Sequence, residues 1–481
     1  MYPVRHTQRL RSTPFGFKAA RCRTLCFWLF LPVCGLVQAQ TAGLSFESAL
    51  ARVRTVSDQL AAAQAGVDSK ALQAQALQGL GGPVVSLSAS VYAYNLNLNV
   101  NLDPVNQSLA QIGQQLAIPL QSLHIPLPQF PSSYTFNRSD TGSTRSVSAV
   151  WPIYSGGVNE AARAFVQAQA DEARADADKT GHEVATQLVQ RYFGAQLATK
   201  AATLRRAALD DIAQHDAATA RMLAAGVVSR VERLQAQAAF EEARRNAQKA
   251  QSDAELATVA VAHMVKSSVV GPLATPLFVL TQPVAPLAYF LTEALARHPG
   301  LAKVAAKQAQ AEQLHHGQEG LRKPQVFVFG QHDLKLAEAD WVGGVGVRWT
   351  LFDSVDRDTL SAASNKQIEQ VAHTERQARS DITLLVEKNW RTVEQARQQF
   401  LATEPGVVLA KEVLRLRTAA LRAGTGTALE LMGADVNLAK VETERAQVAY
   451  DYVYALASLL ESCGLSEQFS AYASRADVRV N

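Results

Sequence analysis

Residues that could carry out chemistry are present in this chain, but their spacing does not bring them together. His315 and His316 are adjacent, and adjacent residues point to different sides of a helix, so this pair does not predict a metal site. Asp171 and Asp176 lie among basic residues in a pattern typical of an exposed helix face. The sequence contains no glycine-rich phosphate loop, zinc-ligand spacing or nucleophile elbow. We therefore expect no catalytic residue, no bound metal, no cofactor and no enzymatic activity.

The clearest local pattern is a short motif that occurs twice, each time between two alanine-rich stretches. Glycine supplies the left-handed backbone that a tight helix reversal needs, and a serine or threonine shortly after it can cap the next helix. The pattern predicts two helical hairpins with equivalent turns. The motif is Ala-Gly-x-x-Ser/Thr-x-x-Glu, with Gly226, Ser229 and Glu232 in the first copy and Gly424, Thr427 and Glu430 in the second.

The two turns belong to a repeat that covers most of the chain. Trp151 and the three residues after it correspond to Trp349 and the three residues after that. A repeat of this length means two copies of one structural unit, and neither copy need fold alone. The expected organisation is a first repeat at 40–270, an extended proline-rich linker at 271–288, a second repeat at 289–465 and a C-terminal tail at 466–481.

The first residues have the pattern of a secretory signal peptide, which we place at residues 1–39. Basic residues come first, an apolar stretch follows at 25–37, and small residues permit cleavage after Ala39. Cys34 is a candidate lipid-anchor cysteine, although the residue before it is unfavourable for that role. After removal of the leader Cys463 is the one cysteine left, which excludes an intrachain disulfide.

Charge and composition restrict the class of partner. The 47 basic and 43 acidic residues are interspersed and form no basic stripe, so we expect no nucleic acid as a partner. After the leader, no apolar stretch is long enough for a transmembrane helix. A membrane protein with this sequence would therefore have to cross the membrane with strands.

Alanine-rich stretches with sparse larger apolar residues predict long helices that pack closely, as in coiled coils. No proline interrupts 159–224, so this stretch could approach roughly 100 Å in length. Pro405 predicts a kink or break in its counterpart. The expected helical stretches are 46–78, 159–224, 229–265, 292–322, 356–423 and 428–462.

Four strands are expected at equivalent places in the two repeats, about 84–94, 143–152, 325–334 and 341–351. Each has about ten residues of apolar and polar alternation, the pattern of a transmembrane β-strand. A soluble β-sandwich is the alternative, but two hairpins joined only by long helices would leave sheet edges unpaired. Because the smallest barrels have about eight strands, several chains must contribute to one barrel.

The two hairpin loops differ in length. The first, at 95–145, is long and almost uncharged, and we place it outside the cell, where long loops of outer-membrane barrels lie. Its beginning, 95–100, alternates and could extend the strand, with a solvated loop as the alternative. The second loop occupies only a few residues at 335–340.

In these features the chain resembles the TolC family of outer-membrane efflux and secretion proteins, from about residue 43 to 465. The resemblance rests on the order and duplication of loose motifs. They are the helix openings at Glu47 and Glu293, the strand junctions at Pro83 and Pro324, the strand exits at Trp151 and Trp349, and the turns at Gly226 and Gly424.

The resemblance implies a mainly α fold with membrane β: a duplicated long-helix coiled-coil unit with two β-hairpins. Four strands per chain would contribute to a 12-stranded barrel in a homotrimer, continued by an α-helical barrel in the periplasm. The implied location is the bacterial outer membrane, with lipid around the strands. The implied role is the exit duct for small compounds, supplied by an inner-membrane pump through a periplasmic adaptor.

The resemblance also implies two kinds of site. The turns would contact the adaptor, and acidic residues beyond them would form the pore constriction, with solvated helix faces as the alternative for the latter. Gly433 and Gly426 depart from the family's best-known member, which has an acidic and a basic residue there; this puts cation selectivity and a salt-bridged closed state in question. The expected contact residues are Gly226, Val227, Ser229, Gly424, Thr425 and Thr427, and the expected constriction residues are Glu232 and Glu430.

Three other functions remain open from the sequence. The same architecture would serve as the outer-membrane component of type I protein secretion. The other two functions are a periplasmic adaptor and a structural stalk, and the duplication argues against both. An adaptor has one helical hairpin, whereas this sequence predicts two. A stalk should show sustained heptads and no two-fold repeat.

Overall fold

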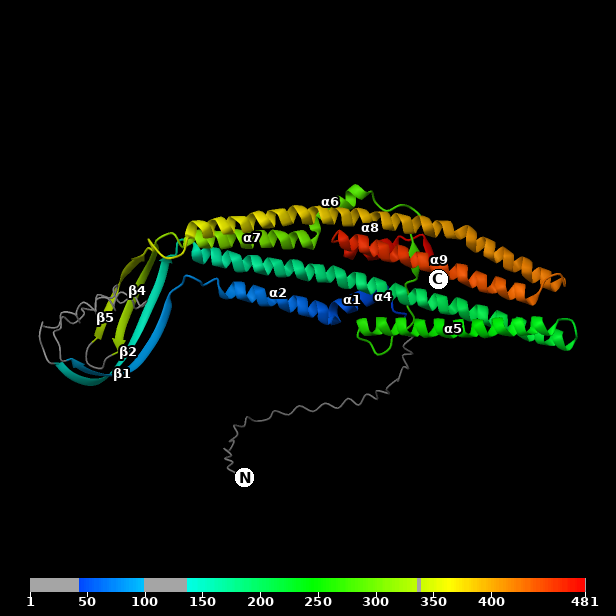
Figure 1. Cartoon of the computed structure of the whole chain (residues 1–481), viewed down its shortest axis with the longest axis horizontal. Helices are drawn as coiled ribbons and strands as arrows, with labels where there is room; N and C mark the ends of the chain where they lie inside the picture. Colours follow the sequence, from blue (N-terminus) through cyan, green and yellow to red (C-terminus); the bar gives the residue numbers. More distant parts are fainter. Residues whose placement is uncertain (1–42, 99–135, 335–338, 481) are drawn as a thin grey trace, which may run out of the picture. The chain divides into compact units, whose positions relative to one another are not determined.

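The structure, a computed structural model, describes residues 43–98, 136–334 and 339–480 (Figure 1). The expected signal peptide, Cys34 and the greater part of each hairpin loop lie outside these residues. Gly43–Asn481 form one compact unit.

The fold of this unit is mainly helical and internally duplicated, which confirms the predicted fold class. Each copy contains two short helices, a β-hairpin and a long helical hairpin. The first copy consists of α1 (Phe46–Val56), α2 (Asp58–Ala76), β1 (Val84–Leu98), β2 (Phe136–Tyr154), α4 (Val158–Ala224) and α5 (Arg230–Met264). The second consists of α6 (Leu287–Arg297), α7 (Pro299–Gly320), β4 (Gln325–Leu334), β5 (Ala339–Arg348), α8 (Arg357–Arg422) and α9 (Ala428–Ser462).

Two helices that the sequence analysis treats as continuous are broken, at equivalent places. In the first copy the stretch 46–78 breaks at Ser57, whose side chain accepts a hydrogen bond from Leu60 N at 3.4 Å and begins α2. In the second the stretch 292–322 breaks at His298, whose Nδ1 accepts from Gly300 N at 3.0 Å, and Pro299 occupies the first helical position. Local capping therefore overrides the helical propensity of the surrounding residues.

The longest helices run from the sheet to the two turns. Helix α4 has 67 residues, or roughly 100 Å at 1.5 Å per residue, and α8 has 66. Of the kink or break expected at Pro405, the break is wrong, because α8 continues through it. Phe400 and Val407 on either side of the proline are buried, so packing holds the helix together across the missing hydrogen bond. Figure 1 shows α4 and α8 each ending at a turn at the end away from the sheet. None of the described helices is both long enough and apolar enough to cross a membrane.

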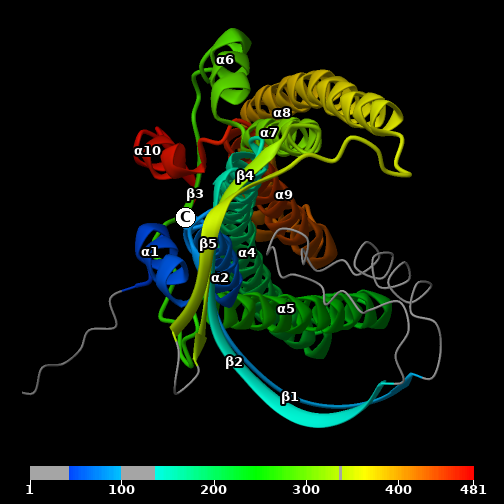
Figure 2. The same cartoon turned by 90° about the vertical axis from the view of Figure 1, so that its left-hand side faces the viewer.

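The four long strands form one antiparallel sheet in the order β1-β2-β4-β5, so the two hairpins meet through β2 and β4. Figure 2 shows β1 and β2 as strongly curved ribbons. The register gives the sheet two unlike faces, because side chains alternate along each strand. One face is mainly apolar, although Arg145 and His332 also lie on it; its apolar members include Val85, Leu87, Val91, Val147, Trp151, Val328, Trp341, Val345 and Val347. The other carries three hydroxyl pairs, Ser86–Ser148, Ser88–Ser146 and Ser90–Thr144, at 2.7, 2.9 and 2.7 Å.

The core lies midway along the helices, where the segments that connect the repeats are part of it. Residues of the linker form β3 (Leu277–Val279), which pairs with β6 (Val478–Val480) of the tail. All three residues of β3 are buried, and Phe278 contacts Phe469 and Phe193. The tail also forms η2 (Ser466–Gln468) and α10 (Phe469–Ser474). The expected linker thus supplies a buried strand, and the expected tail supplies the strand that pairs with it and the buried residues Phe469 and Tyr472.

Candidate functional site at the two helix turns

The two turns have the same backbone geometry, and it depends on their glycines. Gly226 and Gly424 have φ of 71° and 73°, in the left-handed region. Val227 N donates to Met222 O at 2.9 Å, and Thr425 N donates to Ala420 O at 3.0 Å, which is the Schellman pattern at a helix end. A Cβ at either glycine would meet no atom within 4 Å. The requirement for glycine is therefore one of backbone conformation and not of space.

Both helices that leave the turns begin with the same reciprocal capping arrangement. Ser229 Oγ accepts from Glu232 N at 3.2 Å, and the Glu232 carboxylate accepts from Ser229 N at 2.7 Å. Thr427 and Glu430 repeat these bonds at 3.2 and 3.3 Å. The backbone hydrogen bond from Ser229 is the main cause that lowers the pKa of Glu232. The sequence motif is thus a capping box, and its glutamates have a structural role in the chain itself.

The predicted contact residues form two exposed surfaces, one at each turn. The side chain of Val227 is 72% exposed, and Thr425 is also exposed. Ser229 and Thr427 stand at the bases of these surfaces as helix caps. The adaptor contact stays a prediction at this point.

The predicted constriction residues have different electrostatic surroundings. Glu430 pairs with Arg417 of α8 at 3.0 Å, and both side chains are partly exposed. No ion pair to Glu232 occurs in the part of the chain that the structure describes, and the next residue, Arg233, pairs with Asp216 of α4. Within one chain, no hydrogen bond or ion pair among the described residues joins the two glutamates.

The two glycines that depart from the family pattern also differ from each other. A Cβ at Gly426 would lie 3.0 Å from that of Ala420, so the tight turn leaves little room there. A Cβ at Gly433 would meet no atom within 4 Å, and a cavity of about 300 Å³ adjoins it between α4, α5 and α9. The absence of an acidic side chain at Gly433 thus leaves open space. Gly426 offers no basic side chain, but Arg417 of α8 supplies a basic partner for Glu430.

One polar contact near the turns is not predicted from the sequence. Asp435 of α9 is buried, and its Oδ2 lies 3.4 Å from Nε2 of His215 on α4. His215 precedes Gly226 by as many residues as Asp435 follows Gly424. The repeat therefore predicts that the two residues lie at the same level along their hairpins. The contact itself requires knowledge that α9 packs on α4, which the sequence alone does not give.

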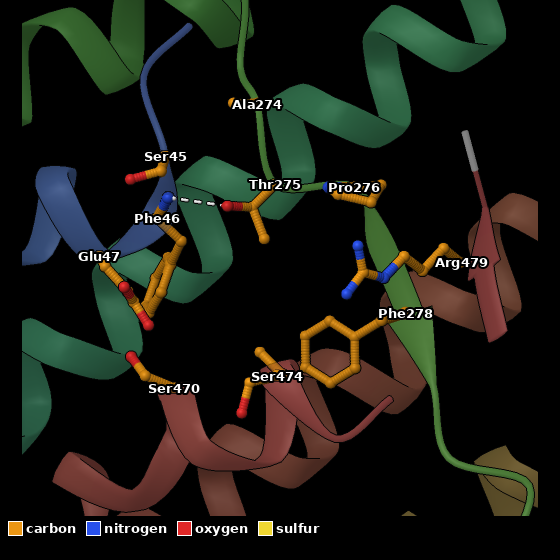
Figure 3. Close-up of a pocket in the computed structure, with 11 residues that line it drawn as sticks. Ser45, Phe46, Glu47, Ala274, Thr275, Pro276, Phe278, Ser470, Ser474 and Arg479 are labelled. Atoms are coloured by element: carbon orange, nitrogen blue, oxygen red, sulfur yellow. Dashed lines mark hydrogen bonds between the residues drawn. The ribbon is translucent and has the colours of Figure 1, made fainter. Parts of the chain in front are cut away.

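Elsewhere the described residues show no arrangement for catalysis. They contain no group of three or more His, Cys, Asp or Glu that could hold a metal ion. Cys463 is buried, and burial raises the pKa of its thiol to about 12, so it is not a reactive nucleophile. A pocket beside the core places Ser470 and Ser474 near Phe46 and Phe278 (Figure 3), but neither histidine nor cysteine lines it.

Comparisons with known proteins agree with this fold. The sequence profile of the family described as outer membrane efflux protein matches residues 125–265 and 290–465, well over half of the chain. No curated protein sequence matches the chain.

Solved structures with this fold include outer-membrane channels. The Campylobacter jejuni outer membrane channel CmeC is 12% identical with a TM-score of 0.71, over 89% of each chain. The open state of the Neisseria gonorrhoeae outer membrane channel MtrE is 15% identical with a TM-score of 0.68, over 88% of this chain and 89% of that one. The outer membrane protein VceC of Vibrio cholerae is 14% identical with a TM-score of 0.67, over 87% of this chain and 96% of that one.

The extent of the family match and the shared duplicated fold lead to one conclusion: this chain belongs to the outer membrane efflux protein family and has the fold of the TolC-like outer-membrane channels.

Proposed function

We propose that this protein is the outer-membrane channel-tunnel of a tripartite efflux system. In this proposal three copies form a passive exit duct that reaches from the outer membrane into the periplasm. An inner-membrane pump supplies small compounds through a periplasmic adaptor, which contacts the turns at Gly226 and Gly424. The observation that carries the proposal is the sheet, because it has two unpaired edges and one apolar face.

The unpaired edges support assembly of several chains into a ring. Among the described strands, β1 and β5 each have one neighbour, and β1 is 15 residues long. Long free edges are a liability that proteins pair or cover. If β5 of one chain pairs with β1 of the next, the contact is head-to-tail and closes by rotation. Three chains of four strands give twelve, enough for a barrel with an interior.

The apolar face supports contact between this barrel and lipid. Val345 is 69% exposed in the single chain and lies on the same face of β5 as Trp341, and Trp349 directly follows the end of the strand. The distance along the chain from Trp341 to Trp349 is roughly 26 Å at about 3.3 Å per residue, which at a strand tilt of about 40° covers roughly 20 Å of the ≈ 25 Å apolar band of membrane barrels. Aromatic residues at both limits of such a band are typical of the two membrane interfaces.

The charges at the turns predict a change in ion selectivity in planar bilayers. A ring of Glu430 side chains favours cations, and Arg417 beside each one offsets that charge. Glu430→Gln should lower the cation-to-anion permeability ratio, and Arg417→Gln should raise it. Each change should be on the order of threefold, as for about one kT of local potential.

Glu255→Gln is the matched control, because Glu255 is exposed on α5 and, among the described residues, accepts a side-chain hydrogen bond from its helical neighbour Gln251 alone. This variant should leave the permeability ratio unchanged. If the purified protein forms no channel at all, the conduit proposal is wrong. If it forms channels with the same selectivity in all variants, Glu430 does not line the constriction.

A further inference from the structure

The face of the sheet that carries the hydroxyl pairs becomes apolar at the end nearer the helices. Val84 of β1 lies opposite Val150 of β2, and Val150 lies opposite Phe329 of β4. Phe327 stands on the same face, two residues nearer the start of β4. These four residues form an apolar belt on the face opposite to the one that the barrel would turn to lipid.

Two glycines of β5 leave room for the aromatic rings of this belt. Phe327 lies opposite Gly346, and Phe329 lies opposite Gly344. A Cβ at Gly346 would lie 2.5 Å from the Phe327 ring, and a Cβ at Gly344 would lie 3.3 Å from the Phe329 ring. The rings therefore extend over β5 into space that side chains would otherwise fill. Their centroids are 6.1 Å apart, so the two rings form one aromatic surface.

Packing between the strands does not bury this belt. Val84 is 65% exposed and Val150 is 43% exposed, and both phenylalanines are only half-buried. In the proposed barrel this face looks inward, so lipid does not cover it. Apolar side chains that face water are stabilised when another apolar body covers them, and ligand sites are lined in this way.

A cation without an anionic partner lies beside the belt. Arg348 follows Gly346 by two residues and so stands on the same face of β5. Its Nη2 donates to Oε1 of Gln325 at 2.8 Å, and this partner is neutral. The side chain of Arg348 is exposed and forms no ion pair with any residue that the structure describes. Its guanidinium is always charged, and its other donors match the two oxygens of a carboxylate.

The acidic residues at this end of the sheet have other roles: Asp353 pairs with Arg357, Asp358 pairs with Arg322, and Asp356 caps α8. Further along the same face of β4, Asp333 stands six residues after Phe327, or roughly 20 Å away at about 3.3 Å per residue. Arg348 is therefore the charge that a compound on the belt would meet first.

We propose that each chain contributes to the inner wall of the barrel a site for aromatic carboxylates. Arg348 binds the carboxylate, and the ring system lies on Phe327 and Phe329. This inference rests on the proposed function, because it takes this face as the inner wall of the channel. It deepens that function by naming a class of compound that the wall retains. A weak site suits a duct, since a compound must leave as readily as it enters.

The test measures how strongly naphthoate reduces the current through the channel in planar bilayers. Two matched probes accompany it: naphthylmethylammonium has the same ring system with the opposite charge, and cyclohexanecarboxylate has the same charge without the aromatic ring. Naphthoate should reduce the current at concentrations roughly tenfold lower than either probe, as for one charge-assisted hydrogen bond or one aromatic contact.

Two variants separate the charge from the rings. Arg348→Gln can still hydrogen-bond Gln325, and it should abolish the preference for naphthoate over naphthylmethylammonium. Phe327→Leu together with Phe329→Leu keeps an apolar cover over the glycines of β5, and it should abolish the preference for naphthoate over cyclohexanecarboxylate.

Arg376→Gln is the matched control for the loss of charge. Arg376 is exposed on α8, roughly 30 Å along the helix from its beginning, and like Arg348 it makes no ion pair within the described part of the chain. This variant should leave the effects of all three probes unchanged.

Equilibrium dialysis of naphthoate against the purified protein in detergent gives a second readout that needs no ion flow. Arg348→Gln should bind naphthoate roughly tenfold more weakly than the wild type. Equal effects of the three probes on the wild-type current, or equal dialysis binding by the wild type and Arg348→Gln, overturns the site and leaves the proposed function standing. Binding that depends on Arg348 in a protein that forms no channel contradicts the proposed function and leaves the site standing.

Discussion

Val345→Arg should keep this protein from accumulating as an assembled complex in the outer membrane. Val345 lies on the apolar face of β5, midway along the chain between Trp341 and Trp349. An arginine on the lipid face near the bilayer midplane costs roughly 2–4 kcal/mol. In a three-chain barrel this cost occurs once per chain, so the assembled form should be strongly depleted. The measurement is the amount of complex in purified outer membranes.

Val342→Arg is the matched control, with the same substitution three residues earlier on the same strand. Val342 lies on the opposite face, across from Gln331. There the arginine would face the water-filled interior, and the amount of complex should remain near that of the wild type. Loss of complex in both variants would indicate a general folding defect. Loss only in Val342→Arg would mean that the two faces are assigned the wrong way round.

The second large effect is expected at the turns. Gly226→Val together with Gly424→Val should abolish efflux, because a β-branched residue is strongly disfavoured at a φ near 70°. Each turn should be strained by about 1–3 kcal/mol, which the hairpin can relieve only by changing the shape of its tip. Drug susceptibility should rise to that of the deletion strain, and cross-linking to the adaptor should disappear.

Gly181→Val separates turn geometry from a general effect of valine. Gly181 lies inside α4 without a positive φ, and a Cβ there meets no atom within 4 Å. This variant should export normally. If the double variant has normal complex levels and unchanged susceptibility and cross-linking, the turns do not bind the adaptor. Val227→Asp, which changes an exposed side chain without backbone strain, should weaken cross-linking while the turn stays intact.

Sequence patterns predict the parts of this fold that repeat. The duplicated Ala-Gly motif predicts both turns, because each turn needs a glycine in the left-handed conformation and a residue that caps the next helix. The strands are equally visible, since their alternation is local, although β2 is longer than the expected 143–152. The run at 95–98 continues β1, as the strand alternative predicts.

The features that the sequence does not reveal depend on contacts between distant segments. Pro405 predicts a kink or break from local chemistry, yet packing of Phe400 and Val407 keeps α8 continuous. The proline-rich linker is predicted to be only a connection between the repeats, yet its residues form β3, which pairs with β6 of the tail. The contact between His215 and Asp435 needs the packing of α9 on α4, since neither residue stands out alone.

The central claim is that several copies of this chain close one barrel in the outer membrane. It is tested most directly by separating inner and outer membranes and running the detergent extract on a gel with and without heating. We predict that the protein fractionates with the outer membrane and migrates as a trimer that dissociates to monomers on heating. A protein found in the soluble or inner-membrane fraction, and as a monomer before heating, would contradict the account.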